Sequence, residues 1–229
     1  MTIDHQVVSH DEWMKASKAL LAKEKEFTKL REEMAQLRRA LPWEKVEKEY
    51  VFDSTDGKVT LAGLFGDKDQ LIVQHFMFGP DWNEGCPSCS YWSDNFNGID
   101  KHLAARDTAF VVISRGPLDK LMAYRKRMGW TFRWVSSLGN DFNFDYRVSF
   151  KKGEKERLYN NGTIAPYGEE TPGLSAFRRK DGQIFHTYST YGRGLDLLNG
   201  AYHLLDITSM GRHEDPERPM SWVKRHDKY

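Results

Sequence analysis

The sequence predicts an α/β fold in which a central mixed sheet is flanked by helices, preceded by a long helix and a β-hairpin. Two runs, 71–78 and 108–113, are almost continuously apolar, as expected of strands covered on both faces. Each is followed by apolar residues at helical spacing, first from Cys89 to Ala104 and then from Pro117 to Met128. The order is therefore βαβα, which indicates parallel strands joined by helices.

The N-terminal part of the chain predicts one long amphipathic helix. Ser9 and Glu12 form a capping-box pair, and apolar residues recur at steps of three or four, or a multiple of that, up to Pro42. The apolar stripe must be covered either by its own subunit or by a partner, so a homodimer is one of two options. We predict a helical extension over 1–45, a central domain over 46–211 and a C-terminal tail over 212–229.

Two hairpins and a closing helix complete the predicted elements. Tyr50–Phe52 and Val59–Leu61 flank a turn in which Gly57 supplies the unusual backbone angle. A second hairpin joins 174–177 to 183–188, and a closing helix is predicted over 195–205. In the aromatic stretch before this hairpin, alternation predicts an extended segment that includes Phe142, Phe144 and Tyr146.

Cys86 and Cys89 are the two cysteines of the chain, and they lie between the first apolar strand and the helix that follows it. Pro87 suits the first helical position, which makes Cys86 the N-cap. A thiolate there meets unpaired N–H groups and the positive end of the helix dipole, so its pKa should fall. We predict that Cys86 is an exposed nucleophile and that Cys89, one turn further in, is a shielded resolving thiol.

Three other interpretations of the cysteine pair stay open. The pair could be half of a zinc site, although the chain has no second cysteine pair and no closely spaced histidine pair. It could be inert core packing, since free cysteine is often buried. It could also be a structural disulfide, but so small a loop constrains little of the unfolded chain.

Composition excludes several classes of function. The chain is 29% charged and 39% hydrophobic with a formal net charge of +1, and it has no apolar run near the length of a membrane span. The start lacks the basic and apolar segments of a signal peptide, so we expect a cytoplasmic protein. Without a basic run or a phosphate loop, we expect no nucleic-acid partner, and we predict no cofactor and no metal.

A βαβ unit, a connecting segment, a ββ hairpin and a final helix are the parts of the thioredoxin fold, and the chain resembles the thioredoxin-like superfamily. It resembles more closely a bacterial family known as domain of unknown function 899, from the N-terminal helix to about Gly211. Four motifs carry this resemblance: Phe78-Gly79-Pro80-Asp81-Trp82, Gly85-Cys86-Pro87-Ser88-Cys89-Ser90, Arg127-Met128-Gly129-Trp130 and His186-Thr187-Tyr188-Ser189-Thr190-Tyr191-Gly192-Arg193-Gly194.

The resemblance implies a cis-proline opposite the redox cysteines, and Pro172 stands directly before the predicted hairpin. A cis bond there would hold the backbone before it beside Cys86, where an extended substrate strand or a disulfide could pair. The alternative is an ordinary trans proline at the start of a strand. Thioredoxins also carry a buried carboxylate behind the second cysteine, but the register places Gln74 there. The proton acceptor is therefore unassigned, with Asp94 and His75 as weak possibilities.

The preferred hypothesis is a thiol–disulfide oxidoreductase that acts on a protein or small-molecule disulfide. Trp82, Pro87, Thr171 and Pro172 are its predicted substrate contacts. A first alternative is a peroxiredoxin-like thiol peroxidase, because the loop before Cys86 and the first hairpin resemble peroxiredoxins. Arg115 and Arg193 could polarise a peroxide, but no Ser or Thr lies between Pro80 and Cys86. A second alternative is a non-catalytic redox-sensing or binding protein.

Overall fold

The computed structural model describes residues 5–154, 158–166 and 168–229 and separates into two compact units, one up to Pro42 and one from Trp43 to Tyr229. The first unit is the helix α1 (His10–Ala40), which confirms the predicted N-terminal helix. Ser9 Oγ accepts a hydrogen bond from Glu12 N at 3.3 Å, and the Glu12 carboxylate accepts one from Ser9 N at 3.0 Å. The predicted capping box is therefore present.

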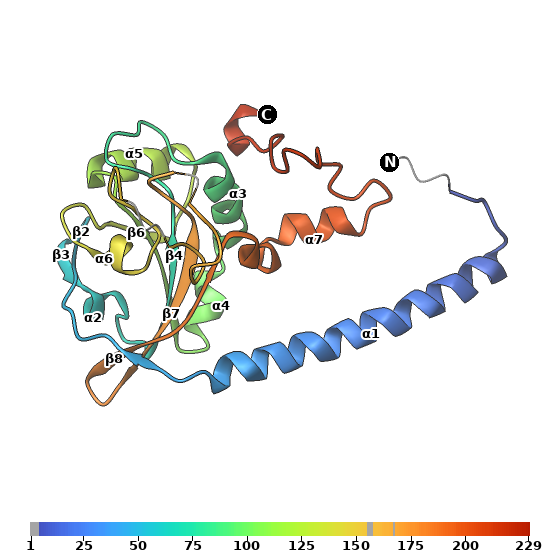
Figure 1. Ribbon diagram of the computed structural model, residues 1–229, viewed down its shortest axis with the longest axis horizontal. Coiled ribbons are helices and arrows are strands. Elements are labelled where there is room, and N and C mark those ends of the chain that lie inside the picture. The colour runs from blue at the N-terminus through green and yellow to red at the C-terminus, as the bar shows by residue number, and fades with distance from the viewer. Residues whose placement is uncertain (1–4, 155–157, 167) are drawn as a thin grey trace. The chain divides into compact units, whose positions relative to one another are not determined.

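The second unit is built on one mixed sheet, which has eight strands within the described part of the chain (Figure 1). Its strand order is β1-β8-β7-β4-β5-β6-β2-β3. The strands are β1 (Glu44–Lys45), β2 (Val51–Ser54), β3 (Gly57–Thr60), β4 (Gln70–His75), β5 (Thr108–Ser114), β6 (Arg133–Ser136), β7 (Gly173–Lys180) and β8 (Gln183–Tyr191). β4 lies in the middle of the sheet, parallel to β5 and antiparallel to β7. This confirms the predicted central strand.

Helices cover both faces of the sheet (Figure 1). They are α2 (Leu61–Leu64), α3 (Pro87–Phe96), α4 (Asp100–Ala104), α5 (Leu118–Arg127), α6 (Phe142–Asp145), the 3₁₀ helix η1 (Gly192–Leu198), α7 (Gly200–Asp206) and the 3₁₀ helix η2 (His226–Lys228). Alternate side chains of β4 face opposite ways. Ile72 packs in a core with α3, α5 and α7, whereas Leu71 and Val73 pack in a second core with α2 and α6. Within the described residues, no helix is both long and apolar enough to cross a membrane.

The connections give the thioredoxin-like fold that the sequence predicted. β4, α3 and β5 form the βαβ unit, and β7, β8 and α7 supply the antiparallel hairpin and the final helix. The first hairpin, β2 and β3, pairs antiparallel around Gly57, whose φ of 99° excludes most side chains. It joins the far edge of the sheet where Asp53 lies opposite Ser136 in β6.

Two helices that the spacing predicted as continuous are each divided in the structure. The helix after the cysteines ends at Phe96 and resumes at Asp100, because Gly98 adopts a φ of 89° that ends the first segment. The closing helix is divided at Asn199, whose side chain accepts a hydrogen bond from Tyr202 N at 3.1 Å. An asparagine in this role starts a new helix rather than continuing the old one.

The prediction of an extended segment over Phe142–Tyr146 is wrong. Asn140 Oδ1 accepts a hydrogen bond from Phe142 N at 2.9 Å and starts the short helix α6. Phe142 and Tyr146, four residues apart, share one face and pack in the core, while Phe144 lies under the Arg115 guanidinium. The three aromatic residues at alternate positions therefore do not share one face: two pack in the core, and Phe144 packs against Arg115.

Candidate functional site

Both cysteines are attached to the chain that extends β4. Cys86 N donates to Met77 O at 3.1 Å, and Met77 N donates to Cys89 Sγ at 3.4 Å. A Cβ at Gly85 would lie 2.6 Å from the Phe76 ring, closer than real Cβ atoms approach. Only glycine therefore lets α3 begin this close to the sheet.

The two sulfurs have different surroundings. Cys86 is the half-buried N-cap of α3, with Pro87 in the first turn, and Cys89 is only 3% exposed; both thiols are free. A hydrogen bond from the Cys89 thiol lowers the pKa of Cys86 to about 7, helped by the amides of Cys89 and Ser88 and opposed by burial. Burial, followed by the interaction with Cys86, raises the pKa of Cys89 well above its ordinary value. Near neutral pH the first thiol is thus partly ionised, and the second is held protonated.

Gln74 lies behind Cys89, where the sequence register placed it. Its Nε2 is 3.5 Å from Cys89 O, and its Oε1 accepts a hydrogen bond from Ser93 Oγ at 3.0 Å. The side chain is buried and neutral, so it fixes the first turns of α3 to the sheet without offering a site for a proton.

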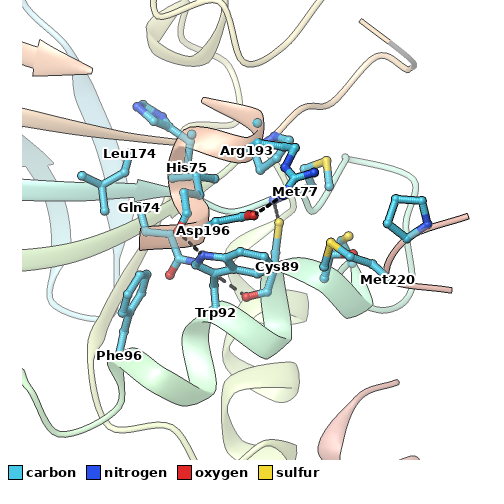
Figure 2. A pocket seen from close by; sticks show the side chains of 17 residues that line it. Gln74, His75, Met77, Cys89, Trp92, Phe96, Leu174, Arg193, Asp196 and Met220 are labelled. Atoms are coloured by element: carbon cyan, nitrogen blue, oxygen red, sulfur yellow. Dashed lines mark hydrogen bonds and ion pairs between the residues drawn. The ribbon is translucent and has the colours of Figure 1, made fainter. Parts of the chain in front are cut away.

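Neither weak candidate for the proton acceptor is placed to serve Cys89. The His75 ring stacks on Phe142 and Tyr146 on the opposite face of the sheet, and Figure 2 shows it pointing away from Cys89. Burial, with a smaller effect from His186, lowers the pKa of His75 to about 3, so the ring is neutral. Asp94 accepts hydrogen bonds from Trp130 Nε1 at 2.7 Å and His226 Nδ1 at 2.8 Å instead.

Pro172 lies opposite the cysteines, but the expected cis bond is absent. Pro172 lines the same cavity as Cys86 and Cys89, and the described residues contain no cis peptide bond. The backbone before it is also already paired, because Thr171 N donates to Val148 O at 2.8 Å. The trans bond is compatible with the role of an ordinary strand-entry proline, since Gly173 begins β7.

Of the four predicted substrate contacts, Pro172 is the one that lines this cavity. Thr171 is buried, with its side-chain oxygen unpaired, and Pro87 lies in the first turn of α3 outside the lining. Trp82 is 39% exposed, as expected of a surface contact, but its indole packs against Gly79 and does not reach the cavity. The structure therefore does not bring Trp82 and Pro172 to one surface of the cavity.

The cavity beside the cysteines has a volume of about 380 Å³ (Figure 2). Phe96 and Leu174 lie at one end and Met220 at the other, with Cys89 between them. Apolar side chains make up most of the wall. They come from the chain just after β4, from α3, from β7 and the residue before it, from η1 and from the C-terminal segment, residues 212–229. These side chains belong to Met77, Trp92, Phe96, Pro172, Leu174, Leu195, Pro219 and Met220.

The C-terminal segment contributes to the site in a way that no sequence signal indicated. Arg225 donates from Nε and Nη2 to Gly85 O at 3.1 and 2.8 Å, and its Nη1 lies 3.0 Å from the Glu84 carboxylate. Arg127 binds Asp227 at 2.7 Å and also contacts Glu84. The segment therefore holds the loop that leads into Cys86. This segment is polar and lacks periodicity, so no sequence pattern connects it with the cysteines.

The two arginines considered for peroxide binding have carboxylate partners. Arg115 lies 2.7 Å from the Glu170 carboxylate, which also accepts a hydrogen bond from Ser149 Oγ at 2.6 Å. Burial raises the pKa of Glu170, with these two partners opposing it. Arg193 lines the cavity and binds Asp196 at 3.1 Å, but its side chain is 86% exposed. Within the described residues, no group of three or more His, Cys, Asp or Glu side chains is placed to hold a metal ion.

Solved structures similar to this chain include two peroxiredoxin-type proteins. Peroxidoxin BcpB from Mycobacterium tuberculosis is 12% identical with a TM-score of 0.49, covering 72% of this chain and 97% of that chain. A PrxQ variant from Xylella fastidiosa is 12% identical with a TM-score of 0.46, covering 71% of this chain and 95% of that chain.

A candidate protein disulfide isomerase from Bacteroides thetaiotaomicron is also similar to this chain. It is 20% identical with a TM-score of 0.42, covering 76% of this chain and 94% of that chain. No curated protein sequence matched significantly. The strand order and connections of this chain are themselves those of a thioredoxin-like fold. A family model described as "Bacterial protein of unknown function (DUF899)" matches residues 2–229, and the chain, whose four motifs resembled this family, belongs to it.

Proposed function

We propose that the protein is a thiol–disulfide oxidoreductase in which Cys86 is the nucleophile and Cys89 is the resolving thiol. The main observation in support of this proposal is that the two sulfurs differ in burial and in pKa. Cys86 is half-buried at the start of α3 with a pKa lowered to about 7, and Cys89 is buried one turn later with a raised pKa. A low pKa supplies thiolate near neutral pH, and a protonated second thiol does not compete for the substrate.

The proposed reaction transfers two electrons to a disulfide. The Cys86 thiolate attacks one sulfur, a mixed disulfide forms, and the first thiolate of the substrate leaves and is protonated by water. Cys89 then loses its proton to water and attacks Cys86 Sγ, which releases the second substrate thiolate and leaves a Cys86–Cys89 disulfide. A dithiol reductant restores the two thiols. Such a cycle suits the cytoplasm, where thiols are kept reduced.

The test uses the full chain, 2-hydroxyethyl disulfide as substrate and dithiothreitol as reductant. We expect Cys86→Ser to abolish the catalysed rate. When dithiothreitol is left out, we expect Cys89→Ser to accumulate a mixed disulfide on Cys86 that mass spectrometry detects. Thr55→Ala is the control, because Thr55 is exposed in the turn between β2 and β3 and does not line the cavity. Full activity in both cysteine variants would contradict the proposal.

The peroxidase alternative has less support from the site. Arg115 is engaged by Glu170, and Arg193 is the one arginine in the cavity lining. Hydrogen peroxide provides the test. Oxidation of Cys86 far faster than that of free cysteine would favour the peroxidase.

The redox-sensing alternative predicts a different result in the same assays. Stoichiometric oxidation of the two cysteines without turnover, together with a change in oligomer size, would favour a sensor.

A further inference from the structure

We infer that the disulfide reduced by Cys86 is a small molecule with apolar substituents, held in the cavity beside the cysteines, and not an extended polypeptide. This inference depends on the proposed oxidoreductase function and specifies its substrate. It is carried by the composition of the cavity wall, by the pairing of the backbone next to Pro172, and by the position of the C-terminal segment.

The cavity is large enough for a small ligand and places it against the reacting sulfurs. Its volume of about 380 Å³ lies in the range of small-molecule sites, and both Cys86 and Cys89 belong to its lining. Trp92 and Phe96 on α3 face Leu174 on β7 across it (Figure 2). An apolar substituent that enters this space leaves water and contacts carbon atoms on several sides.

Three of the backbone groups beside the cysteines that an extended substrate could use are already paired within the protein. Thr171 N donates to Val148 O at 2.8 Å, and Phe150 N donates to Glu169 O at 2.8 Å. Pro172 has no N–H group, and its carbonyl accepts a hydrogen bond from Tyr159 OH at 2.6 Å. A polypeptide strand adds to a sheet through free backbone groups. The N–H of Thr171 and the carbonyls of Glu169 and Pro172 already have hydrogen-bond partners in the chain.

The C-terminal segment forms the remaining side of the cavity. Pro219 and Met220 belong to the lining, and Glu214 Oε1 accepts hydrogen bonds from Met220 N at 3.1 Å and from Trp222 Nε1 at 2.8 Å. Further along, Arg225 binds Gly85 O. The segment is thus held on both sides of Met220, whose side chain lies at one end of the cavity.

The charges at the cavity do not favour a charged disulfide. Arg193 and Asp196 are the charged members of the lining and bind each other at 3.1 Å. Asp196 also contacts Arg212 at 3.2 Å. An anionic substrate would have to compete with a carboxylate for Arg193, and a cationic substrate would have to compete with two guanidinium groups for Asp196.

The experiment compares disulfides that differ in polarity and size. Pre-reduced protein is mixed with dimethyl, diethyl or dipropyl disulfide, 2-hydroxyethyl disulfide, oxidised glutathione, insulin or cumene hydroperoxide. The reaction is quenched with acid, and the oxidised fraction of Cys86 and Cys89 is measured by mass spectrometry. The second-order rate constant should rise by up to about fourfold for each methylene group that enters the cavity. Dipropyl disulfide should react at least ten times faster than oxidised glutathione or insulin, after correction for the uncatalysed rates.

A matched pair of variants tests whether the cavity causes this preference. Met220→Asn places a polar side chain in the wall, and asparagine tolerates the φ of 66° at this position. Met210→Asn is the same substitution at an exposed methionine outside the lining. We expect Met220→Asn to reduce the preference for dipropyl over 2-hydroxyethyl disulfide about fivefold and Met210→Asn to leave it unchanged.

The outcomes separate the two proposals. If no substrate oxidises the protein faster than it oxidises a free thiol, or if Cys86→Ser reacts as fast as the natural chain, the oxidoreductase function itself is wrong. If Cys86 reacts but insulin or oxidised glutathione matches dipropyl disulfide, or Met220→Asn keeps the full preference, the substrate class is wrong. A fastest reaction with cumene hydroperoxide would also overturn the substrate class and favour the peroxidase.

Discussion

Replacement of Cys89 by alanine should raise the pKa of Cys86, because the Cys89 thiol is the main group that lowers it. Serine at the same position keeps a hydroxyl donor and should leave the pKa of Cys86 near 7. The two variants therefore differ in one hydrogen-bond donor. Both lack the resolving sulfur, so each should stop at the mixed disulfide.

The size of the effect follows from the thiolate fraction and the strength of the nucleophile. At pH 7, a thiol of pKa about 7 is half ionised, whereas one at the ordinary value of 9.0 is about 1% ionised. A full return to 9.0 would thus lower the thiolate fraction about fifty-fold. With a Brønsted coefficient of about 0.45, the less acidic thiolate attacks a disulfide about eight times faster. The alanine variant should therefore react about sixfold slower than the serine variant at pH 7.

Which of the two variants reacts faster depends on pH. Below its pKa the Cys86 thiol is protonated and slow, so the variant with the lower pKa is faster at neutral pH. Above about pH 10 both variants are fully ionised, and the alanine variant should be faster by up to about eightfold. The assay is the pH dependence of thiol release from 2-hydroxyethyl disulfide, followed for both variants. Two superimposable profiles would refute the assignment of the shift to the Cys89 hydrogen bond.

Three further predictions concern stability and assembly. Arg225→Ala removes charge-assisted bonds to Gly85 O and should lower the free energy of unfolding by about 2 kcal/mol, whereas Arg218→Ala, with a side chain 80% exposed, should change it little in the same urea titration. Phe142→Ala should cost about 3–5 kcal/mol in that titration, because the ring is fully buried; a cost below 1 kcal/mol would contradict the assigned core. Leu30→Glu tests the homodimer option for α1: we expect it to shift sedimentation toward the monomer, and an unchanged coefficient would count against a dimer formed by this stripe.

The sequence was sufficient to predict those parts of the fold and the site that depend on a local pattern of residues. The almost continuously apolar run over 71–78 indicated a strand covered on both faces, and β4 has that place in the sheet. The position of Cys86 followed from Pro87, and the position of Gln74 followed from the register of one strand. These inferences each needed only a few neighbouring residues.

The sequence was insufficient where distant segments meet. One exception is local: Asn140 Oδ1 accepts a hydrogen bond from Phe142 N at the start of α6, in a segment whose alternation indicated an extended strand. The contact between Arg225 and Gly85 joins residues far apart in the chain, and neither residue carries a periodic signal. The backbone at Thr171 is paired by Val148, in a segment whose fold the composition did not indicate. The contacts of Gly85 and Thr171 are specified by tertiary packing and not by propensity.

The interaction between the two sulfurs favours the proposed order of steps, in which Cys86 attacks first and Cys89 resolves the mixed disulfide. In the reduced protein, the hydrogen bond donated by the Cys89 thiol stabilises the Cys86 thiolate. This hydrogen bond and the negative charge of Cys86 also raise the pKa of Cys89, in addition to the effect of burial. When Cys86 enters a mixed disulfide, its sulfur carries no charge, so both of these contributions to the pKa of Cys89 disappear. The amide of Met77, which lowers that pKa through its bond to Cys89 Sγ at 3.4 Å, then acts mainly against burial. Cys89 thus becomes more acidic only after attack has occurred, and a neutral Gln74 behind it is consistent with a resolving step that needs no carboxylate at that position.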